Sequence, residues 1–256
     1  MFFAVSSLLL LLPLLGVVNA ATPSFNCNAI WGKLRQIDAG AGKVHGVDSN
    51  GDNFSWENNN WKYIPGKLTH VSTGPAGVWG VDKDRQVFRL LNNVWHNVSG
   101  SMKQIDAGGN KFVAGVNSQD NVYCSIQKSA DTPVDWKSMN GSQKYNSCGK
   151  WGCWGVNRDD SVYFRHGVTS EFCQGTGWQL IDGKLIMIET GTDGSVYGVN
   201  SAGNAYRRNG INAMNPTGTS WTQLDLGYNS KHLTYADRYL WLITPTDDII
   251  RCAVTK

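Results

Sequence analysis

The chain has 256 residues, of which 41% are hydrophobic and only 17% charged, so it can bury a core and is not an intrinsically disordered protein. The net charge of +3 comes without any run of basic residues, which excludes a dedicated nucleic-acid binder. The 29 glycines and 11 tryptophans indicate short strands and tight turns rather than long helices.

Residues 1–20 predict a secretory signal peptide. They contain no charged side chain, and the apolar run Leu8–Leu15 is shorter than a membrane span and contains Pro13. The segment Val18-Asn19-Ala20 fits a cleavage site with small residues. We therefore expect residues 21–256 to form one mature domain that is secreted, extracellular and not embedded in a membrane.

The mature chain is organised by a repeat that begins at a tryptophan. The tryptophans are 34, 41, 42 and 43 residues apart, and a further copy with Cys27 in the tryptophan column lies 34 residues before the first of them. The column consists of Trp61, Trp95, Trp136, Trp178 and Trp221. Such self-similarity indicates a repeat architecture, in which each copy is one supersecondary unit.

Each copy continues with the same predicted strands. An apolar strand recurs at 44–48, 78–82, 113–117, 153–157, 196–200 and 239–244. After a polar turn, a third strand recurs at 53–56, 87–90, 122–125, 162–165, 205–208 and 249–252. Four short strands per repeat, with six copies, predict an all-β, six-bladed β-propeller. An open solenoid is less consistent with the two ends of the repeat, because the lone strand around Cys27 can complete the last blade and remove the exposed sheet edges.

The six cysteines predict three disulfides in a secreted chain. Cys27 and Cys252 lie on strands that should pair, so a bond between them would close the ring. Cys148 and Cys153 bracket a turn in blade four, and Cys124 and Cys173 remain for a bond between blade three and the connection after blade four. Six cysteines allow fifteen pairings, so the connectivity stays open at this stage.

The repeat W-x-x-hydrophobic-x-G-x-L/M followed by V-x-G-V-N/D resembles the tectonin β-propeller repeat. The resemblance covers the whole mature chain and is closest to secreted fish egg lectins, with horseshoe-crab tachylectin-1 more distant. It implies a lectin of innate immune defence that binds N-acetylglucosamine-containing glycans, bacterial lipopolysaccharide or peptidoglycan. It implies no required cofactor, although it leaves calcium binding open.

Sugar binding calls for aromatic faces beside planar polar groups, and three repeated columns offer these types. One column places Asp or Asn after the second strand, one places Trp or Tyr within that strand, and one places Arg on the third strand. The candidate binding residues are Trp79, Asp82, Arg89, Asn117, Trp154, Asn157, Tyr197, Asn200 and Arg207. The alternative is structural: Asp and Asn can cap the turn, and Arg can stack on neighbouring aromatics. The main tryptophan column is expected to pack between sheets.

The sequence predicts no enzyme, because it contains neither a nucleophile elbow nor the repeated boxes and arginine triad of sialidases. Carboxylates at Asp82/Asp84, Asp159/Asp160 and Asp247/Asp248 could contribute to calcium binding, but two carboxylates supply few of the oxygens that calcium needs.

N-glycosylation sequons lie at Asn53, Asn97 and Asn140. Longer connections at 126–135, 166–177 and 209–220 could carry recognition or the contacts of a homodimer. The alternative function is a structural or protein-binding propeller of the egg coat or mucosa.

Overall fold

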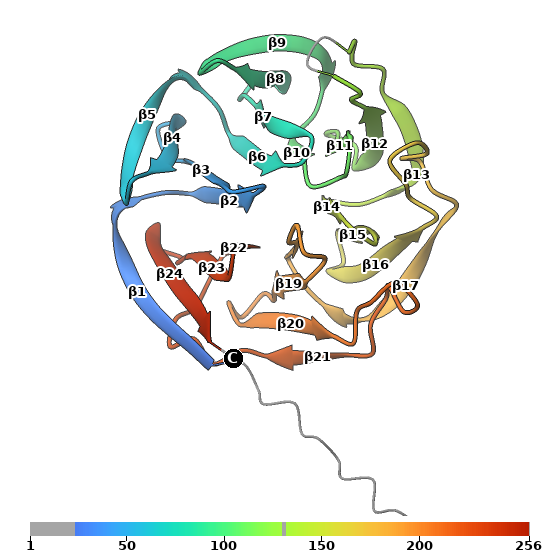
Figure 1. The fold of residues 1–256 in the computed structure, drawn as a ribbon. Helices are drawn as coiled ribbons and strands as arrows, with labels where there is room; N and C mark the ends of the chain where they lie inside the picture. The colour runs from blue at the N-terminus through green and yellow to red at the C-terminus, as the bar shows by residue number, and fades with distance from the viewer. Residues whose placement is uncertain (1–23, 130–131, 256) are drawn as a thin grey trace, which may run out of the picture.

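The computed structural model describes residues 24–129 and 132–255, which form six four-stranded antiparallel sheets arranged as blades around a central axis (Figure 1). This confirms the all-β, six-bladed propeller. The predicted signal peptide lies outside the described residues. In the part of the chain that the structure describes, no helix is long and apolar enough to cross a membrane.

The strands follow the chain blade by blade, from the innermost strand outward. Blade 1 contains β2 (Gln36–Gly40), β3 (Lys43–Val47), β4 (Asp52–Glu57) and β5 (Asn60–Lys67), and blade 2 contains β6 (His70–Gly74), β7 (Gly77–Val81), β8 (Gln86–Leu91) and β9 (Val94–Ser101). Blade 3 contains β10 (Gln104–Asp106), β11 (Phe112–Val116), β12 (Asn121–Ile126) and β13 (Lys137–Ser142), and blade 4 contains β14 (Tyr145–Gly149), β15 (Gly152–Val156), β16 (Ser161–His166) and β17 (Gly177–Lys184). Blade 5 contains β18 (Met187–Thr190), β19 (Val196–Val199), β20 (Ala205–Asn209) and β21 (Ser220–Gln223). Blade 6 contains β22 (His232–Ala236), β23 (Tyr239–Ile243), β24 (Asp248–Thr255) and β1 (Ser24–Lys33).

The ring is closed by β1, which pairs with β24 and becomes the outer strand of blade 6 (Figure 1). Cys27 lies opposite Cys252 in this pairing, and the two sulfurs form a disulfide across 225 residues of sequence. On the chain-entropy model, a cross-link over so long a loop stabilises the fold by about 4–5 kcal/mol. Strand β1 therefore holds the first and last repeats together, as predicted.

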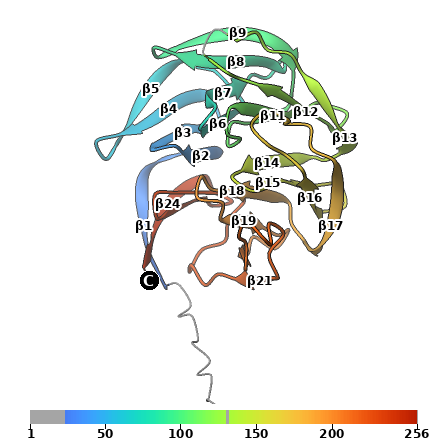
Figure 2. The ribbon, with the colours of Figure 1, turned by 45° about the vertical axis from the view of Figure 1, so that its right-hand side comes forward.

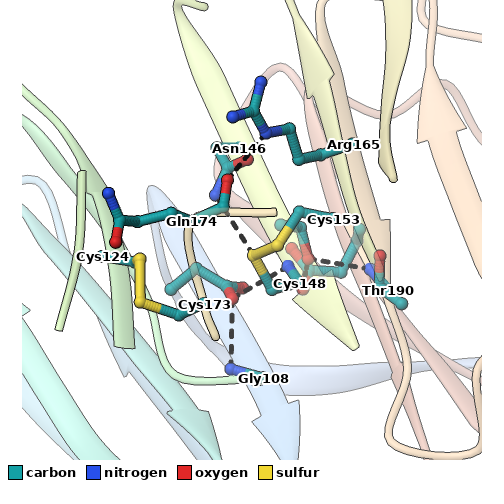
Figure 3. Close-up of a disulfide and its surroundings, with 12 residues drawn as sticks. Gly108, Cys124, Asn146, Cys148, Cys153, Arg165, Cys173, Gln174 and Thr190 are labelled. Atoms are coloured by element: carbon teal, nitrogen blue, oxygen red, sulfur yellow. Dashed lines mark hydrogen bonds between the residues drawn. A yellow bond between two sulfur atoms is a disulfide. The ribbon is translucent and has the colours of Figure 1, made fainter. Parts of the chain in front are cut away.

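The other two disulfides lie close together in the interior (Figure 3). Cys148–Cys153 joins the hairpin of β14 and β15, and Cys124–Cys173 ties β12 to the connection between β16 and β17. All four cysteines are at most 2% exposed. The three predicted pairings are thus confirmed.

The main tryptophan column joins each blade to the one before it. The indole Nε1 atoms of Trp136, Trp178 and Trp221 donate to backbone oxygens of the preceding blade's outer strand at 2.8, 2.6 and 2.8 Å. The ring of Trp136 covers Gly100, where an added Cβ would lie 2.4 Å from the indole nitrogen and where φ is +133°. Glycine is therefore needed where the tryptophan crosses the strand, which explains why the two recur together.

The innermost strands place a ring of polar side chains on the axis. The third position of each inner strand alternates between a carboxyl group and a hydroxyl group around the ring. The six residues are Asp38, Ser72, Asp106, Ser147, Glu189 and Thr234, and all are at most 5% exposed.

These side chains are closely connected by hydrogen bonds. Asp38 accepts from the hydroxyls of Ser72 and Thr234 at 2.8 and 2.9 Å, and Glu189 accepts from the hydroxyl of Ser147 at 3.0 Å. Burial, followed by the charge of Asp38, raises the pKa of Asp106 to about 8. Burial and the same neighbouring carboxyls raise the pKa of Glu189 well above its usual range. The axis is therefore a hydrogen-bonded core in which the raised pKa values of Asp106 and Glu189 favour the protonated forms of these two groups.

A second layer on the axis is formed by Tyr145 and two histidines from alternate blades. The Tyr145 hydroxyl lies 3.1 Å from Nε2 of His232 and 3.4 Å from Nε2 of His70. Burial lowers the pKa of both histidines to about 3, so both are neutral near pH 7. The three side chains pack edge to face and close the centre of the ring at this level.

Candidate functional site

Strand direction divides the loops of the propeller between two faces. Because neighbouring strands in each blade are antiparallel, the turn after the second strand lies at the same end as the connection to the next blade. We call this end the turn face. The connections at 166–177 and 209–220 follow third strands and therefore lie on the opposite face (Figure 2). The described parts of the third predicted connection, residues 126–129 and 132–135, also follow a third strand.

The Asp and Asn column builds the turns of the turn face. In Asp48, Oδ1 accepts from the backbone nitrogens of Asn50 and Asp52 at 2.9 and 2.8 Å. Asn200 does the same for Ala202 and Asn204 at 3.1 and 2.9 Å. Each side chain uses one oxygen to hold the turn, as the structural alternative expected. Its second polar atom makes a longer hydrogen bond: Asn50 Nδ2 donates to Asp48 Oδ2 at 3.4 Å, and Asn200 Nδ2 donates to the Tyr206 hydroxyl at 3.5 Å.

A pocket of about 620 Å³ opens on the turn face between blades 6 and 1, and we call it pocket 6/1. The rings of Trp31, Phe54 and Trp61 line it together with the side chains of Lys33 and Asp48. Trp31 is 85% exposed, well above the next most exposed aromatic side chain among the described residues, Tyr63 at 52%. An exposed indole beside a carboxylate and an ammonium group is the combination that binds the apolar and hydroxyl faces of a sugar ring.

The same arrangement recurs between blades 4 and 5, in a pocket of about 280 Å³ that we call pocket 4/5. Its lining residues occupy the repeat positions that line pocket 6/1. Gly183, Lys184, Leu185, Asn200, Tyr206 and Trp221 correspond to Gly32, Lys33, Leu34, Asp48, Phe54 and Trp61. The pocket is therefore a product of the repeat itself, and the side chain before the glycine distinguishes the copies: Trp31 in one and Asp182 in the other.

A third pocket, of about 760 Å³, lies between blades 5 and 6, and we call it pocket 5/6. Its wall includes the segment after β21, where the sequence carries a two-residue insertion relative to the other repeats. The lining of this pocket is more polar than that of pocket 6/1, because amide, carboxylate and hydroxyl groups lie beside its apolar residues. The polar groups come from Asn204, Gln223, Asp225, Tyr228 and Asn229, and the apolar ones include Leu224, Leu226 and Pro245. Three consecutive junctions thus carry pockets on one face.

The sequence-predicted binding residues lie in two different environments. Asp82, Asn117 and Asn157 hold turns like those of Asp48 and Asn200, and of the nine candidates only Asn200 lines one of the three pockets described above. The rings of Trp79, Trp154 and Tyr197 are at most 2% exposed. Because these rings are packed in the core, they offer no face to a sugar in this conformation.

The arginine column packs against aromatic rings. The guanidinium of Arg89 lies 5.0 Å from the ring centroid of Trp79, and that of Arg251 lies 4.9 Å from the centroid of Tyr239. Arg207 lies opposite Tyr197 in the pairing of β19 with β20. The structure therefore brings Arg89 and Arg207 to the aromatic column and away from the turn residues of the pockets.

Sequence reasoning did not single out the residues that make pocket 6/1 distinctive. Trp31 stands outside the repeated tryptophan column, and that irregularity was the available signal. Phe54 and Tyr206 occupy an aromatic position of the third strand that faces the pocket rather than the core centre. Lys33 and Lys184 belong to the recurring Gly-Lys-Leu motif, whose lysine holds the turn of its own blade.

The carboxylates considered for calcium are held by lysines in most cases. Asp248 pairs with Lys33 at 2.6 Å, Asp84 pairs with Lys83 at 2.8 Å, and Asp160 and Asp247 pair with Lys144 and Lys231. Among residues 24–129 and 132–255, no group of three or more His, Cys, Asp or Glu side chains is arranged to hold a metal ion. The carboxylates of the turn face instead stabilise turns.

The three sequons differ in accessibility. Asn53 is 2% exposed, and its Nδ2 donates to the backbone oxygen of Gly66 at 2.8 Å. Asn97 and Asn140 lie exposed on the outer strand β9 and the outer strand β13. A glycosylating enzyme could reach the latter two without opening a blade.

A tectonin domain model matches residues 33–245. The fish-egg lectin of Cyprinus carpio is 45% identical over 238 residues, which cover 90% of this chain and 99% of that protein. Among solved structures, a protein of Bacteroides thetaiotaomicron superposes with a TM-score of 0.63 at 12% identity, covering 91% of this chain and 77% of that one. Virginiamycin B lyase from Staphylococcus aureus gives a TM-score of 0.57 at 10% identity, covering 84% of this chain and 78% of that one. These two structures share the propeller fold alone.

Proposed function

The chain belongs to the tectonin family, with a lectin 45% identical over 90% of its length, and from this we propose that it is a secreted lectin for N-acetylglucosamine-type sugars. The proposed targets are bacterial surface glycans such as lipopolysaccharide or peptidoglycan, and the proposed role is innate defence. The proposal includes no catalysis, and it assigns binding to the turn face.

One observation carries the assignment of the site: Trp31 is 85% exposed at the rim of an aromatic pocket that also contains Asp48 and Lys33. The apolar face of a pyranose can stack on the indole, and the carboxylate and ammonium groups can bond its hydroxyls. An exposed indole of this kind gains nothing for the fold, since it leaves its apolar area in water. A bound sugar would cover that area.

Repetition of the pocket suits a surface densely covered with sugars. A single site of modest affinity releases its ligand quickly, but several sites on one rigid ring raise the effective concentration for rebinding. Pocket 4/5 repeats the Gly-Lys-Leu, turn and tryptophan positions of pocket 6/1, with Asp182 in place of the exposed Trp31, so we propose it as a weaker second site. The propeller fixes the relative positions of the two pockets. Multivalent attachment to a microbial surface is the mechanism that we propose.

The test is isothermal titration of the mature, oxidised protein with N-acetylglucosamine, together with Trp31→Ala. We expect the variant to bind at least about tenfold more weakly, which corresponds to about 1.4 kcal/mol, with unchanged thermal stability. Phe172→Ala is the matched control, because Phe172 is an aromatic residue 47% exposed in the connection on the opposite face. Equal affinity of Trp31→Ala and the unchanged protein would refute pocket 6/1 as the site. Absence of binding to any glycan, with binding to an egg-coat or mucosal protein, would refute the lectin.

A further inference from the structure

Pockets 5/6 and 6/1 are separated only by the turn between β23 and β24. Thr244, Pro245 and Thr246 line pocket 5/6, whereas Asp248 lines pocket 6/1. The two pockets thus share a wall that belongs to one short turn of blade 6. Since both open on the turn face, a ligand in one pocket reaches the rim of the other across this turn.

The top of the shared wall is a small polar cluster. Lys33 Nζ donates to Oδ1 of Asp248 at 2.6 Å and to the backbone oxygen of Thr246 at 3.1 Å. The Thr246 hydroxyl donates to Oδ2 of Asp248 at 2.7 Å. Lys33 lines pocket 6/1 and Thr246 lines pocket 5/6, so a direct hydrogen bond joins the two rims. The ammonium and carboxylate groups remain largely exposed, at 60% and 46%, and can bond a ligand that passes over them.

The two pockets differ in chemistry, and this difference suits successive sugar units of one oligosaccharide. Pocket 6/1 is mostly apolar and aromatic, with Trp31, Phe54 and Trp61 in its wall. Pocket 5/6 is more evenly divided between polar and apolar groups, and it offers amide, carboxylate and hydroxyl groups, including those of Asp225 and Tyr228. An apolar pocket favours the ring face or the acetamide methyl of a sugar, and a polar pocket favours its hydroxyls. Repetition of one identical monosaccharide site would not require this difference.

We propose that pockets 5/6 and 6/1 are two subsites of one site for an oligosaccharide, whose chain crosses the Lys33–Asp248 pair on the turn of blade 6. This rests on the proposed lectin function and extends it from a single terminal sugar to the interior or end of a glycan chain. The ligand class is a neutral oligosaccharide of linked pyranoses. Two linked subsites give higher affinity than either alone, because the second contact is intramolecular.

The chain offers a close control for the shared wall. Lys67 occupies the same repeat position as Lys33, donates to Oδ1 of Asp52 at 2.8 Å and to the backbone oxygen of Asn50 at 3.2 Å, and is 63% exposed. It lies at the junction of blades 1 and 2 and lines none of the three pockets. Lys67→Ala therefore removes the same bonds from an equivalent turn. Neither lysine substitution should unfold the protein, since exposed ion pairs contribute little to stability.

The experiment is isothermal titration with N-acetylglucosamine and its β-1,4-linked oligomers up to the hexamer. We expect the affinity to rise at least about tenfold from the monomer to the longer oligomers. We expect Lys33→Ala and Tyr228→Ala each to remove most of this gain, and Lys67→Ala to retain it. The same Kd for monomer and oligomers, with several monomers bound per protein, would overturn the two-subsite site while leaving the lectin intact. Absence of binding by every sugar would overturn both.

Discussion

The axis and the turn face both carry repeated carboxylate side chains, but these side chains have different roles in the two places. On the axis, Asp38 accepts hydrogen bonds from hydroxyls and backbone nitrogens of neighbouring blades, and it is 4% exposed. On the turn face, Asp48 uses Oδ1 to hold its turn, and its Oδ2 accepts a longer bond from Asn50 Nδ2, at 3.4 Å, beside an open pocket. A repeated carboxylate is therefore structural where short, buried hydrogen bonds occupy its oxygens, and a ligand can compete for an oxygen whose bond is long and exposed to solvent.

The largest effect is expected on the axis. Asp38→Ala removes the acceptor of the Ser72 and Thr234 hydroxyls and of the Thr73 backbone nitrogen, all of which are buried. Each donor left without a partner costs about 1–3 kcal/mol, so we expect a loss of about 3–5 kcal/mol in the free energy of unfolding. Urea denaturation measures this. A loss below about 1 kcal/mol would show that the axial ring does not hold the blades together.

The axis should also make stability depend on pH. An unfolded Asp loses its proton near pH 4, whereas folded Asp106 keeps it up to about pH 8, so the folded state binds more protons between these values. Stability contributed by the protonated carboxyl groups is therefore lost as the pH rises through this window. Below about pH 6.5 the buried histidines oppose this trend, because their lowered pKa values favour stability at higher pH.

Between pH 6.5 and 8, the carboxyl groups act alone within this axial cluster, and one proton changes stability by about 1.4 kcal/mol per pH unit. We expect the Asp106 carboxyl alone to lower the free energy of unfolding by up to about 2 kcal/mol over this range, and Glu189, whose pKa is also raised, to add to the decrease. Asp106→Asn, which cannot ionise, should make the decrease less steep. An equally steep decrease in this variant would assign the titration to other groups.

Asp48 and Asp82 hold equivalent turns in blades 1 and 2, but only one of them lies beside a pocket. Asp48→Ala and Asp82→Ala each remove an oxygen that accepts from two backbone nitrogens, so each should cost about 1 kcal/mol in stability. Only Asp48 lines pocket 6/1, and we expect only Asp48→Ala also to weaken sugar binding. Denaturation and titration of both variants separate the two roles. Equal loss of binding in both variants would point to a further site at Asp82.

The smallest effect is expected from metal removal. The carboxylates of Asp84, Asp160, Asp247 and Asp248 are already paired with lysines. We therefore expect a chelator to change neither the melting temperature nor the affinity for N-acetylglucosamine by more than the error of measurement. A rise in the melting temperature on adding calcium would show that carboxylates leave their lysines to bind it.

The architecture was predictable because it is encoded by repetition. Tryptophan spacing, the Gly that lets each indole cross the preceding strand, and the pairing of Cys27 with Cys252 all follow from positions that recur or complement one another. The role of the Asp and Asn column in holding turns could also be predicted from the sequence, since such side chains favour hydrogen bonds to the backbone of their own turn. These features depend on local sequence or on register between repeats.

The proposed binding pockets were harder to predict from the sequence because they form between blades. Pocket 6/1 combines Lys33 of one end of the ring with Asp48 and Asp248, which become neighbours only when the ring closes. Burial of Trp79 and exposure of Trp31 depend on which strand faces a neighbouring blade, and both are tryptophans near glycine in the sequence. The departure from the repeat at Trp31 is the feature that sequence analysis should weigh in related propellers.

A crystal structure of the mature protein with a β-1,4-linked N-acetylglucosamine trimer would show where on the propeller the sugar chain lies. We predict a pyranose ring stacked on the indole of Trp31, with the chain continuing over the pair of Lys33 and Asp248 toward pocket 5/6. A trimer bound only on the opposite face, or an empty pocket 6/1 in crystals whose turn face is open to solvent, would contradict the account.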